Sequence, residues 1–137
     1  MKYYIVIPSY NEEALIGLTL QSLISQTVLP SKIVVVNDNS TDRTAEVVLE
    51  FAKNNPYISL VNKSSENIHL PGSKVIQAFE KGFETLDDNY DLIVKIDADL
   101  IFPTNYFETI IKHFQSDERI GMVGGFCYIE KNGEWIL

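Results

Sequence analysis

Two aspartates separated by one small residue are the strongest chemical signal in this sequence. Asp97 and Asp99 follow directly after the apolar run Leu92 to Ile96. This run is short, rich in β-branched residues and bounded by polar residues, which is the pattern of a buried strand. Side chains two positions apart in an extended chain point the same way, so the two carboxylates are expected to share one side. Hard oxygen ligands placed in this way hold Mg²⁺ or Mn²⁺ and leave coordination positions for phosphate oxygens.

Two other predicted strands also end in polar clusters. The segment Pro8 to Glu12 follows the first strand, and the segment Asn37 to Ser40 follows the second. In a parallel sheet these segments meet Asp97 to Asp99 at the edge where ligands bind in open α/β folds. Helix capping or an ordinary polar loop explains any one of the clusters. Three clusters at the same edge favour a binding site.

The apolar pattern predicts alternating strands and helices along the whole chain. Strands are predicted at Tyr3 to Ile7, Lys32 to Val36, Tyr57 to Val61, Leu92 to Ile96 and Ile120 to Ile129. Helices are predicted from a cap at Asn11 to about Gln26, from a cap at Ser40 or Thr41 to Asn54, from Ser73 to Leu86, and from Pro103 onward. This order implies an α/β fold with a mostly parallel sheet and helices on both faces.

Several local features are expected within this framework. Pro8 should stop the first strand, because proline cannot continue a central ladder. The polar stretch Asn62 to Pro71 is expected to form a mobile loop near the site, and Asn132-Gly133 a hairpin turn. Each helix is expected to bury one apolar stripe. The stripes, in chain order, are Ile16, Leu20, Leu23 and Ile24; Ala45, Val48, Leu49 and Ala52; Val75, Phe79, Phe83 and Leu86, with Gly82 on the same side where close packing is needed; and Phe107, Ile110, Ile111 and Phe114.

Composition limits the class of protein. The chain has 137 residues, which corresponds to about one domain, and 45% of them are apolar, which is enough for one core. The net charge is −8, with no basic stripe, so binding to a nucleic-acid backbone is disfavoured. An acidic protein that binds a polyanionic nucleotide needs a means of neutralising phosphate, and a divalent metal on carboxylates is one such means.

The single cysteine and the hydropathy pattern indicate the compartment. Cys127 is the only cysteine, so no internal disulfide forms, which fits a reducing compartment. We expect Cys127 to be buried in the strand Ile120 to Ile129, because free cysteine behaves as a small hydrophobe. No signal peptide precedes the first strand, and no apolar stretch approaches the roughly 20 residues of a membrane span. A cytoplasmic location is expected, with the inner face of the membrane as the alternative.

The common nucleotide-binding motifs are absent. The loop after the first strand lacks the Gly-x-Gly-x-x-Gly of dinucleotide-binding folds, and the chain has no Gly-x-x-x-x-Gly-Lys-Ser/Thr loop. Instead, the segments Ile7 to Glu12, Val34 to Thr44 and Lys95 to Leu100 resemble the three signatures of family 2 glycosyltransferases with the GT-A fold. Their order and spacing match, and the resemblance covers nearly the whole chain.

The resemblance implies a role for individual residues. It implies nucleotide-binding residues at Pro8, Tyr10, Glu12, Asp38 and Asp97. It implies that Asp99, together with Asp97, coordinates Mg²⁺ or Mn²⁺ on the diphosphate. Gly72 to Lys74 is similar to a segment that lies near the diphosphate in the family, and a solvated lysine is the alternative for Lys74. Position 37 is Asn where the family usually has Asp, and an Asn side chain still accepts hydrogen bonds.

The resemblance also implies the reaction. A sugar passes from a nucleotide-diphosphate-sugar donor to an acceptor hydroxyl on a saccharide or a lipid-linked acceptor, with inversion, in cell-surface polysaccharide biosynthesis. Residues 1–137 are expected to form a single donor-binding domain, without the acceptor-binding half and without the catalytic general base. No partner nucleic acid and no membrane span are expected, and the sequence does not indicate an oligomeric state.

Three alternatives remain open from the sequence alone. The chain is a non-catalytic nucleotide-sugar binding module if binding occurs without turnover. A nucleotidyltransferase would need a basic, Gly-rich loop after the first strand, whereas Pro8 to Glu13 is acidic. A haloacid-dehalogenase-type phosphatase also places Asp-x-Asp after a strand, but there Thr or Val follows, whereas Leu100 follows here.

Overall fold

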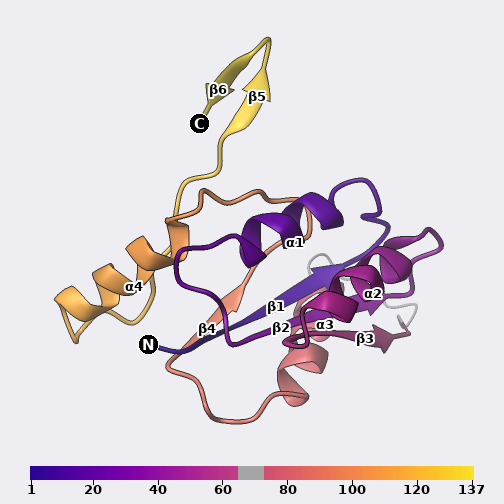
Figure 1. Ribbon diagram of the computed structural model, residues 1–137, viewed down its shortest axis with the longest axis horizontal. Helices are drawn as coiled ribbons and strands as arrows, with labels where there is room; N and C mark the ends of the chain where they lie inside the picture. Colours follow the sequence, from indigo (N-terminus) through magenta and orange to yellow (C-terminus); the bar gives the residue numbers. More distant parts are fainter. Residues whose placement is uncertain (65–72) are drawn as a thin grey trace.

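The chain forms an alternating α/β fold, seen in a computed structural model that describes residues 1–64 and 73–137 (Figure 1). The elements are β1 (Tyr3–Ser9), α1 (Ile16–Ile24), β2 (Lys32–Asp38), α2 (Thr44–Asn54), β3 (Ile58–Lys63), α3 (Ser73–Glu84), β4 (Leu92–Lys95), α4 (Tyr106–Ser116), β5 (Ile129–Lys131) and β6 (Glu134–Ile136). The order of strands in the main sheet is β3-β2-β1-β4, and all its pairs are parallel. The predicted parallel sheet is therefore confirmed. Most of the loop predicted at Asn62 to Pro71 lies outside the described residues.

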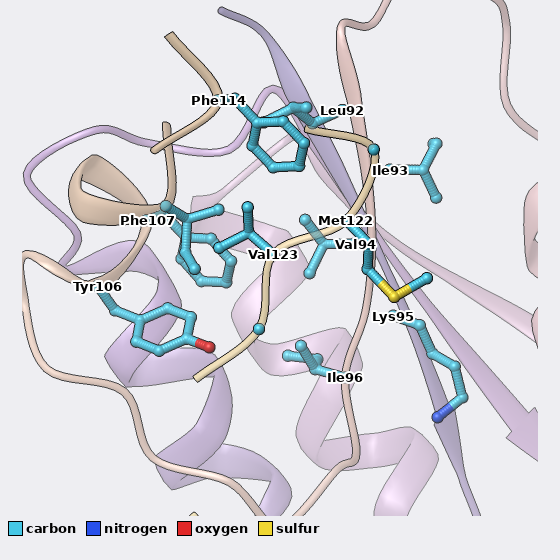
Figure 2. A pocket seen from close by; sticks show the side chains of 13 residues that line it. Leu92, Ile93, Val94, Lys95, Ile96, Tyr106, Phe107, Phe114, Met122 and Val123 are labelled. Carbon is cyan, nitrogen blue, oxygen red and sulfur yellow. The ribbon is translucent and has the colours of Figure 1, made fainter. Parts of the chain in front are cut away.

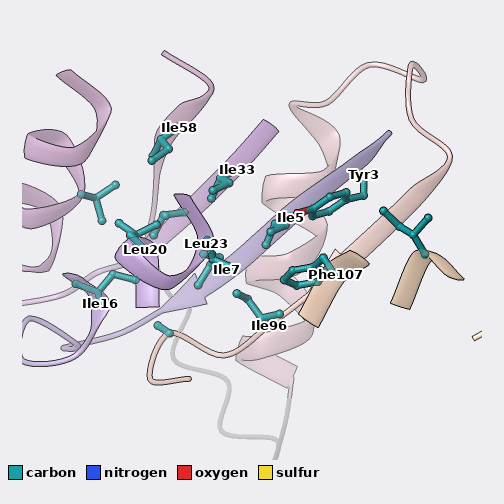
Figure 3. Packing of buried hydrophobic residues seen from close by; sticks show 14 residues of the cluster. Tyr3, Ile5, Ile7, Ile16, Leu20, Leu23, Ile33, Ile58, Ile96 and Phe107 are labelled. Atoms are coloured by element: carbon teal, nitrogen blue, oxygen red, sulfur yellow. The ribbon is translucent and has the colours of Figure 1, made fainter. Parts of the chain in front are cut away.

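Helices cover both faces of the sheet, as predicted. On one face, α1, α2 and α4 pack against β1 and β2 and form the larger core cluster (Figure 3). The ring of Phe107 from α4 stacks on Tyr3 of β1, with 4.9 Å between ring centroids. On the other face, Ala78 of α3 packs against valines of β1 and β2. The central strands are buried on both sides, which accounts for their nearly continuous apolar sequences.

Pro8 does not stop β1, contrary to the prediction. It lies within the strand and is paired in register with Val36 of β2. The carbonyl groups of Lys2 and Val6 accept hydrogen bonds from the β4 side, so Pro8, two residues further on, also faces β4. The register of β1 with β4 ends at Val6 and Lys95. The missing N–H of Pro8 therefore costs no ladder bond, because β4 has already ended.

The buried faces of α2 and α3 differ in part from the predicted stripes. Leu49 is 50% exposed, whereas Val47 and Phe51 pack on the core in its place. In α3, Val75 and Phe83 are exposed, and the small residues Ala78 and Gly82 are buried against the sheet. A side chain added at Gly82 would meet the valines of β1 and β2, so α3 lies closer to the sheet than a stripe of large residues allows. The predicted face of α4, at Phe107 and Ile111, is confirmed.

The end of the chain differs most from the prediction. Residues 120–128 form no strand, and β5 begins only at Ile129. Cys127 is exposed rather than buried. The predicted Asn-Gly turn is confirmed: Asn132 and Gly133 have φ angles of 53° and 79° and join β5 to β6 in an antiparallel hairpin. The hairpin projects from the body of the domain (Figure 1), and its two strands form a separate small sheet whose residues are all exposed.

An apolar pocket of about 390 Å³ lies at the β4 edge of the sheet. Side chains of β4 and α4 and the segment 121–124 line it (Figure 2), and no carboxylate is among them. We therefore do not place the chemistry there. In the parts of the chain that the structure describes, no helix is both long enough and apolar enough to cross a membrane.

Candidate functional site

A polar cleft opens at the carboxyl edge of the sheet. It has a volume of about 650 Å³, which is in the usual range for sites that bind small ligands. Segments that are distant in the sequence line it: the ends of β1 and β2, the turn after β4 and the first turns of α3. All the residues predicted as ligand-binding lie along it: Pro8, Tyr10, Glu12, Asp38, Lys74, Asp97 and Asp99. Gly72, which was grouped with Lys74, lies outside the described residues.

The loops after β1 and β2 are joined by reciprocal hydrogen bonds. Three successive backbone N–H groups, of residues 11 to 13, donate to side chains of the other loop: Ser40, Thr44 and Asp42. In return, Oδ1 of Asn11 accepts a hydrogen bond of 2.8 Å from the backbone N–H of Thr41. This pairing fixes Tyr10 and Glu12 relative to Asp38 and Thr41, which line the cleft from the other loop.

The same pairing corrects the predicted helix caps. Asn11, Ser40 and Thr41 were expected to begin helices, but α1 begins at Ile16 and α2 at Thr44. Asn11 has a φ of 49°, in the left-handed region that Asn tolerates better than most residues. Its side chain is used for the contact between loops, so no capping oxygen is left for its own helix.

Asp38 ends β2 on the cleft side and is 7% exposed. It is paired in register with Lys63 of β3, and the Lys63 Nζ lies 3.7 Å from an oxygen of the carboxylate. The neighbouring Asn37 donates from Nδ2 to the side chain of Asn62 and accepts at Oδ1 from the N–H of Ser40. An ionised aspartate at position 37 could not donate to Asn62, and it would keep a bond to that side chain only by accepting one from the Asn62 amide.

Asp97 and Asp99 lie in a turn after β4 rather than in the strand itself, because β4 ends at Lys95. Both are exposed, while Ala98 between them is buried. The Lys95 Nζ lies 3.3 Å from a carboxylate oxygen of Asp97 and offsets part of its charge. The turn thus presents two carboxylates to the cleft, on either side of an anchored alanine.

Negative charge accumulates where Glu12 lies near Asp42, Asp97 and Asp99. Burial first, and then the charges of Asp99, Asp42 and Asp97, raise the pKa of Glu12 above its usual value. Asp42 behaves in the opposite way: burial works against its ionisation, but hydrogen bonds from Thr44 and from the N–H of Glu13 outweigh it and lower its pKa. A cation in the cleft would relieve the repulsion that Glu12 experiences.

The side chains around Asp97 and Asp99 offer oxygen ligands to a divalent metal. Across residues 1–64 and 73–137, no three His, Cys, Asp or Glu side chains converge to enclose an ion. Two exposed carboxylates at Asp97 and Asp99 fit Mg²⁺ or Mn²⁺, because these ions keep water and phosphate oxygens in the remaining positions. The residues therefore fit a metal that arrives with a diphosphate and do not form an all-protein cage.

Helix α1 and the residues just after it hold the chain segment that follows β4, and the sequence prediction missed these contacts. The hydroxyl of Thr19, which is fully buried, donates a 2.9 Å hydrogen bond to the carbonyl oxygen of Ala98. The Gln26 side chain donates to the carbonyl oxygen of Pro103 and accepts from the N–H of Phe107. A signal was present, because Thr19 interrupts the apolar stripe Ile16, Leu20, Leu23 on the buried face of the helix.

The sequence resembles known proteins over most of its length. The sequence model of the family described as "Glycosyl transferase family 2" matches residues 4–136. An uncharacterized glycosyltransferase from Escherichia coli (strain K12), YibD, is 27% identical over 98% of this chain and 37% of its own length. A probable glycosyltransferase from Bacillus subtilis (strain 168), YdaM, is 32% identical over 90% of this chain and 29% of its own length.

The fold is shared with a solved structure, that of the mannosyltransferase PcManGT from Pyrobaculum calidifontis in complex with GDP-Man and Mn²⁺. The TM-score is 0.67 at 23% identity, over 88% of this chain and 34% of that one. The chain spans about a third of the length of the two relatives named above. With the family match over almost every residue, we conclude that the chain belongs to glycosyltransferase family 2.

Proposed function

We propose that this chain binds the donor in a metal-dependent, inverting glycosyltransferase that transfers a sugar from a nucleoside diphosphate to an acceptor hydroxyl. One observation carries the proposal: a single cleft collects Pro8, Tyr10, Glu12, Asp38, Asp97 and Asp99 from three separate strand ends. Family membership gives the class of reaction. It also argues against the phosphatase and nucleotidyltransferase alternatives.

The two ends of the cleft take different parts of the donor in this proposal. Asp38, held beside Lys63, accepts a hydrogen bond from the base, and the exposed ring of Tyr10 lies against the nucleoside. The turn after β4 that carries Asp97 and Asp99, called the acidic turn below, receives the diphosphate. Its two carboxylates would hold Mg²⁺ or Mn²⁺. When bound, the metal offsets the negative charge that grows on the leaving diphosphate. Lys74, from the first turn of α3, adds a positive charge to the lining of the cleft.

Inversion requires direct displacement at the anomeric carbon by the acceptor oxygen. The bond from that carbon to the diphosphate breaks as the new glycosidic bond forms, and a general base takes the proton of the acceptor hydroxyl. The acidic residues of the cleft are assigned to the donor, so we propose that the base lies outside residues 1–137. A saccharide or a lipid-linked acceptor is proposed on the same basis, and a reducing, cytoplasmic compartment suits a chain with one exposed cysteine.

Calorimetric titration with UDP, GDP and dTDP, each with and without Mn²⁺, tests the donor site. We expect one nucleotide to bind, and to bind more tightly when Mn²⁺ is present. The Asp99→Ala variant should lose the gain from Mn²⁺, because it removes a carboxylate from the acidic turn. The matched control is Asp88→Ala, which removes an exposed aspartate from a turn outside the cleft. Equal Mn²⁺ gains in wild type and Asp99→Ala would rule out the metal assignment.

The second candidate function is that of a non-catalytic nucleotide-sugar binding module. It is supported by the fact that the chain matches only part of the length of its relatives. The chain corresponds to 37% and 29% of the length of two of them, so turnover does not follow from the match. Both candidates predict the same nucleotide binding. An assay of sugar transfer on a protein that contains this chain and the remaining length of its relatives separates them, since only the enzyme releases nucleoside diphosphate in proportion to glycosylated acceptor.

A further inference from the structure

The acidic turn of the cleft rests on a helix that takes no part in ligand contact. Within the described chain, α1 contributes no residue to the lining of the cleft. Thr19 of α1 nevertheless contacts the chain that leaves β4 at Ala98, and Gln26, two residues beyond the end of α1, contacts it at Pro103 and Phe107. A third bond, from the backbone N–H of Thr27 to the carbonyl of Thr104, adds to the second contact. The segment from Ala98 to Phe107 is therefore held at one end by α1 and at the other by the residues that follow α1.

The Thr19 hydroxyl is in an unusual position for a polar group. It lies on the face of α1 that buries Ile16, Leu20 and Leu23, and it is fully buried itself. A hydroxyl in such surroundings costs free energy unless it is hydrogen-bonded. Its shorter bond, 2.9 Å, goes to the Ala98 carbonyl, and the alternative acceptor within its own helix, the Leu15 carbonyl, lies at 3.3 Å. The bond to Ala98 is the one that reaches another element.

That bond bears directly on the two aspartates. Ala98 lies between Asp97 and Asp99, and its carbonyl belongs to the peptide plane that joins Ala98 to Asp99, so the bond from Thr19 restrains the backbone between the two carboxylates. The carboxylates themselves are exposed, and Asp97 forms an exposed ion pair with Lys95. Their separation is consequently set by the backbone of the turn more than by side-chain contacts. Removal of the Thr19 hydroxyl would leave the Ala98 carbonyl without its donor and release the turn.

We infer that Thr19 is a positioning residue for the metal-binding end of the cleft, acting through the Ala98 carbonyl. The inference rests on the proposed function, because it assigns Asp97 and Asp99 to a divalent cation. Thr19 touches neither the nucleotide nor the cation. It belongs with the outer groups that orient metal ligands, whose loss typically lowers metal affinity by about 10- to 100-fold.

The test compares two substitutions at one position. Thr19→Val keeps the shape of the side chain and removes the hydroxyl, whereas Thr19→Ser keeps the hydroxyl. Calorimetry measures the affinity for the nucleotide that the wild type binds, first without metal and then with Mn²⁺. We expect Thr19→Val to keep the metal-free affinity within about two-fold and to lose roughly 10-fold or more of the gain from Mn²⁺. Thr19→Ser should retain that gain.

A control for general loss of stability uses Ile33→Val, which removes one buried methyl group from the same core cluster. Ile33 lies near the start of β2, at the opposite end from the cleft, so the Mn²⁺ gain should not change. A second measurement needs no metal: amide hydrogen exchange over residues 97–102 should be faster in Thr19→Val than in wild type and unchanged in Ile33→Val.

The possible outcomes distinguish a failure of the role inferred for Thr19 from a failure of the proposed donor-binding function. If wild type shows the Mn²⁺ gain and Thr19→Val shows the same gain, the inference is wrong and the proposed function stands. Equal losses with and without metal, or an equal loss in Ile33→Val, would also overturn it, because they indicate general destabilisation. If folded wild type binds no nucleotide, the proposed function fails and the inference fails with it.

Discussion

The contact of α3 with the sheet makes one substitution unusually informative. A Cβ atom at Gly82 would lie 2.7 Å from Cγ1 of Val6 and from Cγ2 of Val36, and 3.5 Å from Cγ1 of Val34. Because carbon atoms rest about 3.5–4.0 Å apart, two of these methyl groups must move by roughly 1 Å. Val6 and Val36 are fully buried, and valine has little rotamer freedom, so neither side chain can rotate away from the added methyl group.

Two opposing terms set the size of the effect of Gly82→Ala. Overpacking a well-filled core typically costs about 1–3 kcal/mol. Alanine within a helix is more favourable than glycine by roughly 0.5–1 kcal/mol. The net expectation is a loss of about 1–2 kcal/mol in the free energy of unfolding. Gly17→Ala is the matched control, because its Cβ would lie at ordinary contact distances, 3.5 Å from Val47 and 3.6 Å from Phe51.

The same chemical change is therefore predicted to have opposite signs in two helices. Gly17→Ala should raise the free energy of unfolding by about 0.4–1 kcal/mol, since nothing opposes the loss of freedom in the unfolded chain. Urea denaturation of the two variants and the wild type measures both effects. If Gly82→Ala is as stable as the wild type, or more stable, then α3 does not pack as closely on β1 and β2 as described. A loss of stability in Gly17→Ala would contradict the interpretation of α1.

Two further predictions concern charge. Because burial and neighbouring carboxylates raise the pKa of Glu12, its ionised form destabilises the fold, so Glu12→Gln should raise the melting temperature at pH 7. That advantage should vanish as the pH falls below about 4, where Glu12 is protonated in both states, and a persistent advantage would contradict this cause. Lys32 and then Tyr4 hold the pKa of Asp87 far below its usual value through hydrogen bonds, so its stabilisation is present above about pH 4 and is lost on further acidification. Asp87→Asn should therefore be less stable at pH 7 and show a weaker acid dependence in thermal melts at pH 2 to 5, whereas parallel curves would refute the role of Asp87.

The location of the site was predictable because it depends on patterns that are local in the sequence. Each strand is a short β-branched run, and each polar cluster follows its strand directly, so the parallel topology alone brings the clusters together. Asp38, Asp97 and Asp99 lie in the cleft for this reason. The stripes of α1 and α4 follow a helical period and were predicted correctly for the same reason.

The features that were missed depend on partners distant in the sequence. Asn11 has the composition of a helix cap, but its side chain bonds to Thr41, thirty residues away, and its backbone is left-handed. Pro8 continues its strand only because β4 ends early on that side. The run Ile120 to Ile129 has the composition of a strand, but among the described residues only its last residue, Ile129, is paired in a sheet. The residue types of a segment limit the conformations and hydrogen bonds that it can adopt. Contacts with residues distant in the sequence then select one of them.

Helix α1 connects the missed contacts to the acidic cleft. At its start, the carbonyl oxygen of Glu12 accepts hydrogen bonds from the N–H groups of Leu15 and Ile16, so the position of Glu12 depends on the helix. One turn later, Thr19 holds the carbonyl between Asp97 and Asp99. The same helix therefore sets how close Glu12 lies to Asp99, and this closeness contributes to the raised pKa of Glu12. The packing of α1 on the core therefore contributes to the repulsion among Glu12, Asp97 and Asp99 in the unliganded cleft. A cation bound there would relieve this repulsion, and that relief would strengthen its binding.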